Sequence, residues 1–382
     1  MMGLFFGLSI FAQSKAYGGQ GEPVPNWVTK LPETSSLNSE FSKPILNGPY
    51  VYVGSSQQSG VLIFERSSGA LVDTLNVDAP VQSHVQFFDG SIFLADTAGT
   101  VYRFKPNGKL IWKRSTQAPI LSQIHIEDSR LLVQNVDDVL TALNLDTGDL
   151  IWRYAHKTDI SRRRDMTLYG ASVPHLQDEY IYAGFSDGAI VQLQEADGTV
   201  ENIRWIGEGR YPDIIAAPSV IETQLIVSGA ESPLSGQALS LQDELWRLDV
   251  GSNHSVVELD EASFLHSGTD GVLRAIEKRT GAELWSWDSD IQAALSEPLV
   301  TEMGIIVSSS GGTVYCIDPE TQEMSWEFQP DHHISGLQHS PVIDGKDIVW
   351  LSNAGFLYAY RFPEPEHQSC AGIFCDWMTV KP

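Results

Sequence analysis

The feature of this sequence that most constrains its fold is a repeat with a period of about 40 residues. Each unit carries a polar turn that ends in Thr-Gly or a close variant, and a Trp follows four residues after the Gly. The cleanest copies are Thr147–Trp152 and Thr280–Trp285. From Trp112 to Trp152 the spacing is 40 residues. A period of this length is typical of architectures in which each repeat is one supersecondary unit.

Each unit has the pattern of four short antiparallel strands. A second Gly lies upstream of the turn, and runs of β-branched and aromatic residues flank it, as in residues 50–54 and 61–65. Such runs favour strands joined by tight hairpins, because Gly supplies the positive φ that these turns need. Four short strands in a unit of this length make the blade of a β-propeller. The sequence therefore predicts an all-β fold.

The number of units and the two ends of the repeat region predict a closed ring. The second Gly, or Asp138 in one copy, marks eight units. The eighth unit, Leu337–Phe362, lacks a fourth strand with Trp, whereas the segment around Trp27 is a fourth strand with no blade before it. Joining them hides both sheet edges. We therefore predict that residues 17–362 form an eight-bladed β-propeller of four-stranded antiparallel blades, closed by the N-terminal strand around Trp27.

Two residue types in the repeat have structural interpretations. The Trp that recurs after each turn is expected to wedge between neighbouring blades, because a buried indole removes a large apolar area from water. Cys316 stands where other copies have Ala, so it is interpreted as a small core residue.

Residues 1–16 have the pattern of a signal peptide. The apolar run 3–12 is too short to span a bilayer, and Ser14 and Ala16 are small residues suited to cleavage after Ala16. No basic residue precedes the run, and no Cys that could carry a lipid anchor follows it. No later segment is apolar and long enough for a transmembrane helix, so none is expected in the mature chain.

Residues 363–382 form a C-terminal tail that contains Cys370 and Cys375. In an oxidising periplasm these two residues can close a small disulfide loop, or they can remain two thiols, because spacing alone does not define the geometry.

The charge of the chain excludes one large class of partner. With 24 Lys and Arg against 49 Asp and Glu, the formal net charge is -25, which argues against nucleic acid because polyphosphate binding depends on clustered cations. Arg162–Arg164 form the one basic run, in a loop that can either present Arg side chains to carboxylates of a partner or relieve charge repulsion as a solvated loop.

The sequence favours no catalytic, cofactor or metal site. It has no Gly-x-Ser-x-Gly elbow, phosphate loop or His-Glu-x-x-His helix. Asp331, His332, His333 and His339 lack the regular spacing that places ligands on one face. Five histidines recur near the opening strands of their units, where a polar ring around the channel can hold a small ligand. These are His84, His125, His175, His254 and His339.

The repeat itself resembles a known type. The segment Asp146–Trp152 resembles the quinoprotein-type propeller repeat, which two functional branches share. Quinone-dependent dehydrogenases are much longer and carry an adjacent Cys pair, which this chain lacks. The BamB family, non-catalytic periplasmic subunits of the outer-membrane β-barrel assembly machinery, is similar to this chain in length, in eight blades, in closure by an N-terminal strand and in its signal peptide.

This resemblance implies a protein partner and a docking site. The segment Met166–Pro174 is similar to a family segment that binds the periplasmic domains of the barrel subunit, with Tyr169 in place of an Arg. Asp213 matches a second partner segment, in which Ile215 departs from the family pattern. Together with the neighbouring basic loop, the candidate partner-binding residues are Met166, Leu168, Tyr169, Asp213 and Arg164.

The resemblance therefore implies a scaffold without catalytic activity that acts as a monomer within a complex. It would work in the periplasm, in association with the outer membrane, and would assist the insertion of β-barrel proteins. The alternative is a propeller that binds a small ligand, such as one similar to the dehydrogenases that depend on pyrroloquinoline quinone (PQQ).

Overall fold

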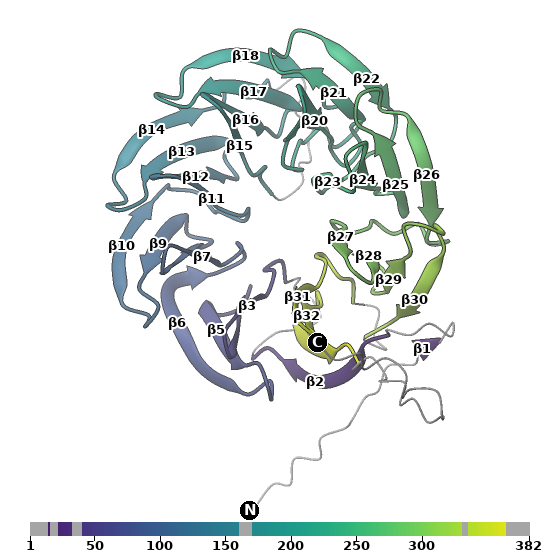
Figure 1. The fold of residues 1–382 in the computed structure, drawn as a ribbon. Coiled ribbons are helices and arrows are strands. Elements are labelled where there is room, and N and C mark those ends of the chain that lie inside the picture. The colour runs from purple at the N-terminus through teal and green to yellow at the C-terminus, as the bar shows by residue number, and fades with distance from the viewer. Residues whose placement is uncertain (1–13, 16–21, 33–39, 160–169, 331–334, 364–382) are drawn as a thin grey trace, which may run out of the picture.

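The computed structural model describes residues 14–15, 22–32, 40–159, 170–330 and 335–363. Within these ranges, all regular secondary structure is β-strand, and eight antiparallel sheets are arranged in a ring (Figure 1). The predicted all-β, eight-bladed propeller is confirmed. Over the same residues there is no helix long and apolar enough to cross a membrane.

In blades 1 to 7, four consecutive strands run from the channel to the perimeter (Figure 1). Blades 1 to 4 are β3 to β6 (Ile45–Asn47, Tyr50–Gly54, Ser59–Glu65, Leu71–Pro80), β7 to β10 (Gln86–Phe88, Ser91–Ala95, Thr100–Phe104, Leu110–Ser115), β11 to β14 (His125–Glu127, Arg130–Asn135, Val139–Asn144, Leu150–Ala155) and β15 to β18 (His175–Gln177, Tyr180–Gly184, Ala189–Gln194, Val200–Trp205). Blades 5 to 7 are β19 to β22 (Ser219–Ile221, Gln224–Val227, Leu234–Ala238, Glu244–Leu248), β23 to β26 (Val257–Glu258, Ser263–Ser267, Val272–Glu277, Glu283–Asp288) and β27 to β30 (Leu299–Thr301, Gly304–Ser308, Val314–Ile317, Met324–Phe328).

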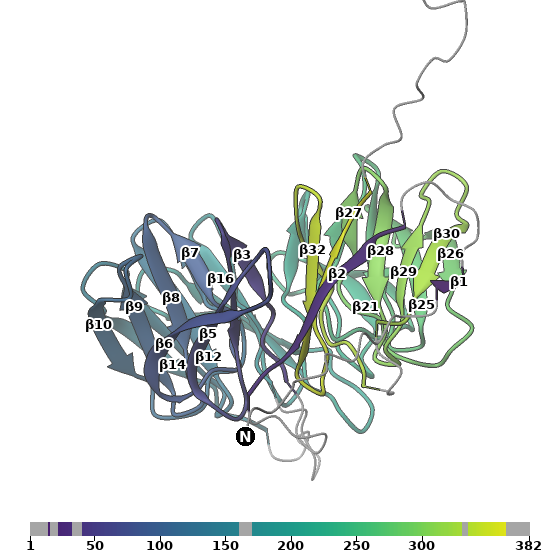
Figure 2. The same ribbon diagram turned by 90° about the horizontal axis from the view of Figure 1, so that it is seen from below.

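Blade 8 combines the two ends of the repeat region. It contains β31 (Val342–Asp344), β32 (Asp347–Leu351) and β33 (Phe356–Arg361), and its outermost strand is β2 (Val24–Lys30). Figure 2 shows β2 beside the C-terminal strands of this blade. In the antiparallel register Trp27 lies opposite Ala359, so the predicted closure by the strand around Trp27 is confirmed.

A charged contact supports this closure. Arg66 of blade 1 donates from Nη1 to Asp344 and from Nε to Asp347, both at 2.5 Å, and its Nη2 donates to the carbonyl of Asp344 at 2.7 Å. Both aspartates belong to blade 8. The two ends of the ring are therefore joined by strand pairing within blade 8 and by ion pairs across the seam between blades 8 and 1.

The hydrophobic core lies between neighbouring blades. One cluster, for example, packs Leu140 and Trp152 of blade 3 against Ile181 and Val191 of blade 4. Because each blade shares its buried surface with the next, no blade has a complete core of its own, and closure of the ring completes the last interface.

The recurring Trp and Gly residues form the contact between blades. The indole of Trp112 in blade 2 lies against Gly148 in the turn of blade 3, where a Cβ would come within 2.6 Å of the ring. Gly148 also has a φ of +70°, a conformation that favours Gly. The Trp112 Nε1 donates to the carbonyl of Leu145, which is also in blade 3, at 3.1 Å. Equivalent pairs are Trp27 with Gly69, Trp152 with Gly198 and Trp246 with Gly281. These contacts confirm the predicted wedge.

In several blades a small residue of the third strand lies opposite the recurring Trp, whereas Trp112 lies opposite Arg103. Trp152 pairs in register with Ala142, Trp285 with Ala275 and Trp326 with Cys316. Cys316 is fully buried, and burial raises the pKa of its thiol to about 12. Its predicted role as a small core residue is confirmed.

A two-residue strand, β1 (Ser14–Lys15), pairs with the outer edge of β30 in blade 7, with Ser14 opposite Phe328. It falls within residues 1–16, for which the sequence predicts a signal peptide. The rest of that segment, and the tail with Cys370 and Cys375, lie outside the described residues.

Candidate functional site: the loops of blades 4 and 5 and the central channel

The predicted partner-binding residues fall on two connections of the ring. Arg164, Met166, Leu168 and Tyr169 lie outside the described residues. Asp213 is described and lies between β18 and β19, the connection from blade 4 to blade 5, where it is only 1% exposed. Its carboxylate is therefore part of the interior of this connection. The roles of all five residues remain predictions.

The two predicted partner segments are brought together where they enter their blades. Ser172, three residues after Tyr169 in the chain, donates a hydrogen bond from Oγ to the carbonyl of Ala216 at 3.3 Å. A Cβ at Gly170 would lie 3.7 Å from Cγ2 of Ile215. The chain that leaves the first segment is therefore in contact with the second, although Ser172 and Ala216 are 44 residues apart in the sequence.

Buried polar contacts hold the beginning of the connection from β14 to β15, which contains the first segment. Asp187 accepts hydrogen bonds from Nε2 of His156 at 3.0 Å and from the backbone N–H of Asp159 at 2.9 Å. Burial would raise the pKa of the Asp187 carboxyl, but these hydrogen bonds, with that of His156 the strongest, bring it below its usual value. An ionised, buried aspartate thus fixes the backbone at residue 159, where the loop begins.

Serines that precede the innermost strands connect the blades around the channel. Each lies three residues before its strand, and two of them contact the same position of the next blade. The Oγ of Ser42 donates a hydrogen bond to the carbonyl of Ser83 at 3.3 Å, and the Oγ of Ser172 donates one to the carbonyl of Ala216 at 3.3 Å. Members of this set are Ser42, Ser83, Ser122, Ser172 and Ser296, with Ala216 in blade 5. The sequence interpretation missed this position, although a Ser three residues before the inner strand recurs in five of the eight blades.

The residues that follow these serines face a cavity of about 540 Å³ in the central channel. The cavity is also lined by three of the five histidines predicted near the channel, namely His84, His254 and His339. The other two, His125 and His175, begin β11 and β15 and are not among its lining residues. The structure therefore divides the predicted polar ring into two groups.

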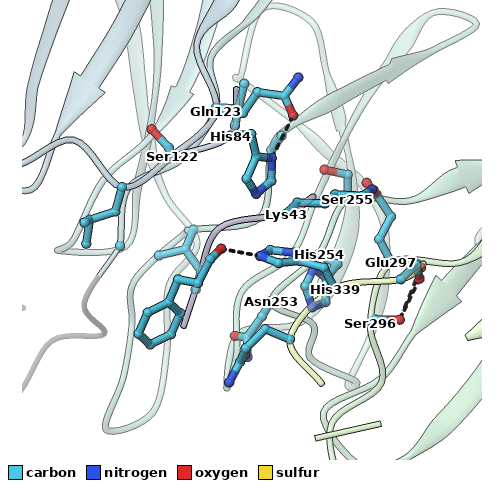
Figure 3. Close-up of a pocket in the computed structure, with 18 of the residues that line it drawn as sticks. Lys43, His84, Ser122, Gln123, Asn253, His254, Ser255, Ser296, Glu297 and His339 are labelled. Atoms are coloured by element: carbon cyan, nitrogen blue, oxygen red, sulfur yellow. Dashed lines mark hydrogen bonds between the residues drawn. The ribbon is translucent and has the colours of Figure 1, made fainter. Parts of the chain in front are cut away.

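The three cavity histidines form a connected group with Lys43 (Figure 3). The ring centroids of His84 and His339 are 4.8 Å apart, and those of His254 and His339 are 6.4 Å apart. Nε2 of His339 is 2.7 Å from the carbonyl oxygen of Phe41, so this nitrogen carries the proton and donates it.

These histidines are neutral at pH 7. Burial lowers the pKa of His254 to about 3, with smaller contributions from His339 and Lys43. Burial also lowers the pKa of His339 to about 4, although its hydrogen bond to Phe41 opposes the shift. The pKa of His84 is lowered well below its usual value for the same reasons as that of His254. Lys43 is therefore the cation of this group.

The described residues contain no group of three or more His, Cys, Asp or Glu side chains with a geometry suited to a metal ion. His332 and His333, whose spacing does not favour a metal site, lie outside the described residues.

Comparison with known proteins identifies the family. The family described as "Outer membrane protein assembly factor BamB" matches residues 57–286 and 269–362. The assembly factor BamB of Burkholderia pseudomallei is 22% identical over 329 residues, which cover 83% of each chain. BamB of Shewanella oneidensis is 22% identical over 264 residues, 67% of this chain and 65% of the relative.

Solved structures share the fold. The crystal structure of BamB from Moraxella catarrhalis superposes with a TM-score of 0.71 at 16% identity, covering 89% of this chain and all of the other. Sqt1 from Saccharomyces cerevisiae superposes with a TM-score of 0.66 at 12% identity, and at such identities the likeness concerns the fold alone. The family match extends over most of the sequence and most of the ring. This chain belongs to the family of the outer membrane protein assembly factor BamB.

Proposed function

We propose that this chain is a periplasmic scaffold without catalytic activity that binds the barrel subunit of the outer-membrane assembly machinery and assists the insertion of β-barrel proteins. Family membership supports a role in outer-membrane assembly. The proposed docking site is carried by one observation, the contact of Ser172 with Ala216, which holds the two predicted partner segments together at blades 4 and 5.

The physical basis of this function is a rigid ring that presents two loops. Loops held by a rigid framework need little ordering when a partner binds, so more of the contact energy appears as affinity. Met166, Leu168 and Tyr169 would supply an apolar anchor of the kind that dominates interface energetics, and Arg164 a charge beside it. Because Asp213 is buried, we propose that it acts by holding the second loop in place.

The direct test measures binding of the full chain to the periplasmic domains of the barrel subunit. We expect Leu168→Asp to weaken the complex by at least about tenfold, because a charge would replace an apolar anchor. Leu150→Asp is the matched control, since Leu150 is 57% exposed on the outer strand of blade 3, away from these loops. Equal binding by both variants, or no complex with the unmodified chain, would contradict the proposal.

The basic loop is tested separately by replacing Arg162, Arg163 and Arg164 with Ser. If these residues meet carboxylates of the partner, affinity falls at low salt and the difference shrinks as salt rises. If binding at low salt were unchanged, the three Arg residues would not contact the partner, and the loop would serve only as a solvated loop that relieves charge repulsion.

The absence of catalysis is tested with the cofactor of the related enzymes. Incubation with PQQ and Ca²⁺, followed by an absorption spectrum and a dye-reduction assay, should show neither a bound quinone nor turnover. Dye reduction above the level of free cofactor would instead place the chain with the dehydrogenases. Cell fractionation tests the location, and recovery of the chain in the cytoplasm would contradict it.

A further inference from the structure

The wall of the central cavity differs between its two sides. Blades 4 and 5 line it with apolar residues and glycine alone, whereas the other blades add charged and polar side chains to apolar ones such as Leu121 and Leu295. In six blades, the residue that follows the serine position described above is among those that line the cavity. These residues are Lys43, His84, Gln123, Val173, Ala217 and Glu297, in blades 1, 2, 3, 4, 5 and 7. Only blades 4 and 5 place an apolar side chain there, and Gly170, Ala171 and Ile215 extend this apolar surface.

The two sides face each other across the ring. In a ring of eight blades, blade 1 is opposite blade 5 and blade 8 is opposite blade 4 (Figure 1). Lys43 of blade 1 therefore lies across the channel from Ala217, and His339 of blade 8 lies across from Val173. A molecule in this cavity would contact cationic and imidazole groups at one end and aliphatic groups at the other.

The histidines narrow the channel on the polar side. His84 comes from blade 2 and His254 from the opposite blade 6, yet both rings contact that of His339 from blade 8. Figure 3 shows these three side chains and Lys43 gathered together. The group thus forms a polar surface that extends partway across the channel.

Lys43 is a partly buried cation that makes no ion pair with any of the residues the structure describes. In a protein with a net charge of -25, a partly buried and unpaired ammonium is suited to an anionic ligand. We propose that the cavity binds a small amphiphilic anion, with its oxyanion head group against Lys43 and the three histidines and its apolar part against Val173, Ala217 and Ile215.

The chemistry of the group favours an anion over a metal ion. Three neutral imidazoles could each offer a lone pair, but the ammonium of Lys43, which lines the same cavity, repels a cation. One ring nitrogen of His339 is also occupied in donating to Phe41. A volume of about 540 Å³ is within the range of small-molecule sites.

Protons should couple to binding. The titratable and charged groups that face the head group are Lys43, His84, His254, His339 and Glu297. An oxyanion beside the histidines favours their charged form and raises their pKa values, so binding takes up protons and strengthens as pH falls from 7.5 to 5. Glu297 acts in the opposite direction, because its carboxylate repels an anion.

The test uses the full chain and isothermal titration with octanoate and octyl phosphate. We expect both to bind, with affinity for octanoate at least about threefold higher at pH 5.5 than at pH 7.5. Octanamide, which lacks the charge, and acetate, which lacks the apolar chain, should both bind at least about tenfold more weakly. If octanamide or acetate bound as tightly as octanoate, the proposal that the cavity binds an amphiphilic anion would be wrong. Zn²⁺ binding that blocks octanoate and is lost in His339→Asn would assign the group to a metal instead.

Variants with opposite expected signs separate this site from general surface charge. Lys43→Gln should weaken octanoate binding about tenfold, and Glu297→Gln should strengthen it about threefold. Lys113→Gln removes the same charge from the outer strand of blade 2 and should change nothing. Equal effects of Lys43→Gln and Lys113→Gln would overturn the site. None of these variants touches the loop residues tested with the barrel subunit, so either proposal can fail without the other.

Discussion

The interfaces between blades and the wall of the channel are built from the same repeat in opposite ways. At the interfaces the same pair recurs, with a Trp of one blade against a Gly in the turn of the next, as in Trp112 with Gly148. On the channel wall one position carries six different residues in six blades, from Lys43 to Glu297. Repetition marks the residues that hold the ring together, and divergence at a repeated position marks the residues available for binding.

The largest expected effect is at an interface. Trp326 is 2% exposed and packs with Phe328 and Trp350 in the core between blades 7 and 8. Trp326→Ala should lower the free energy of unfolding by about 3–5 kcal/mol, because it leaves a large cavity. Asn202→Ala is the control at the equivalent position of blade 4, where it removes one hydrogen bond to Gln192 and should cost about 1 kcal/mol. Chemical denaturation measures both, and similar losses would contradict the structural role of the Trp.

A smaller effect is expected at the Gly of the same contact. In Gly148→Ala, the new Cβ would collide with Trp112 at a backbone φ of +70°, which should cost about 2–3 kcal/mol. Gly108→Ala has the same backbone strain, with a φ of +76°, but its Cβ would lie 3.5 Å from Leu75, so the expected cost is about 1 kcal/mol. Equal losses of stability in the two variants would show that backbone strain, and not contact with the Trp112 indole, is the reason that Gly occupies position 148.

The sequence predicts the interfaces well and the channel in part, for a physical reason. A residue that must fit the same neighbour in every blade leaves a period, so the Trp spacing predicts the fold, the number of blades and the closure at Trp27. On the channel wall, recurrence near the opening strands indicates His84, His254 and His339. It does not indicate Lys43 or the contacts among the histidines, because these side chains come from distant blades that meet only in the closed ring. The burial of Asp213 had no sequence pattern either, since a family resemblance indicates position but not exposure.

A buried histidine within a blade provides a contrast with those of the channel. His266 in the second strand of blade 6 is fully buried, and neither ring nitrogen has a hydrogen-bond partner in the described structure. Burial, followed by the charge of Arg274, lowers its pKa to about 3. The folded pKa is thus below the unfolded value of about 6.5, so stability is full above pH 6.5 and is lost as pH falls towards 3.

His266→Leu should therefore leave stability unchanged or higher at pH 7.5 and should raise it by about 2 kcal/mol relative to the unmodified chain at pH 5. Denaturation curves at the two pH values measure this difference. If the difference in unfolding free energy between the variant and the unmodified chain did not increase from pH 7.5 to pH 5, His266 would already be protonated or paired in the folded protein.

The closure between blades 8 and 1 should show a more modest effect. Arg66→Met removes the hydrogen bonds to Asp344 and Asp347 and should cost about 1–2 kcal/mol at pH 7. Burial would raise the pKa of Asp347, but hydrogen bonds from Arg361 and Arg66 hold it below its usual value. The cost should therefore shrink as pH falls below about 4, where the carboxylate takes up a proton. Lys113→Met, which breaks the exposed pair with Asp78, should cost less than about 0.5 kcal/mol.

The smallest effect on stability is expected on the channel wall. The wall position carries a different residue in each of six blades, so no single side chain is needed there for folding. Lys43→Gln should change the free energy of unfolding by less than about 0.5 kcal/mol at pH 7.5, because the ammonium has no ion pair among the described residues to lose. At pH 5 the variant should be more stable than the unmodified chain. Removing the Lys43 charge raises the lowered pKa values of His84, His254 and His339 towards their unfolded value, so less stability is lost on acidification. A loss at pH 7.5 as large as that of Arg66→Met would mean that the channel wall, like the interfaces, holds the ring together.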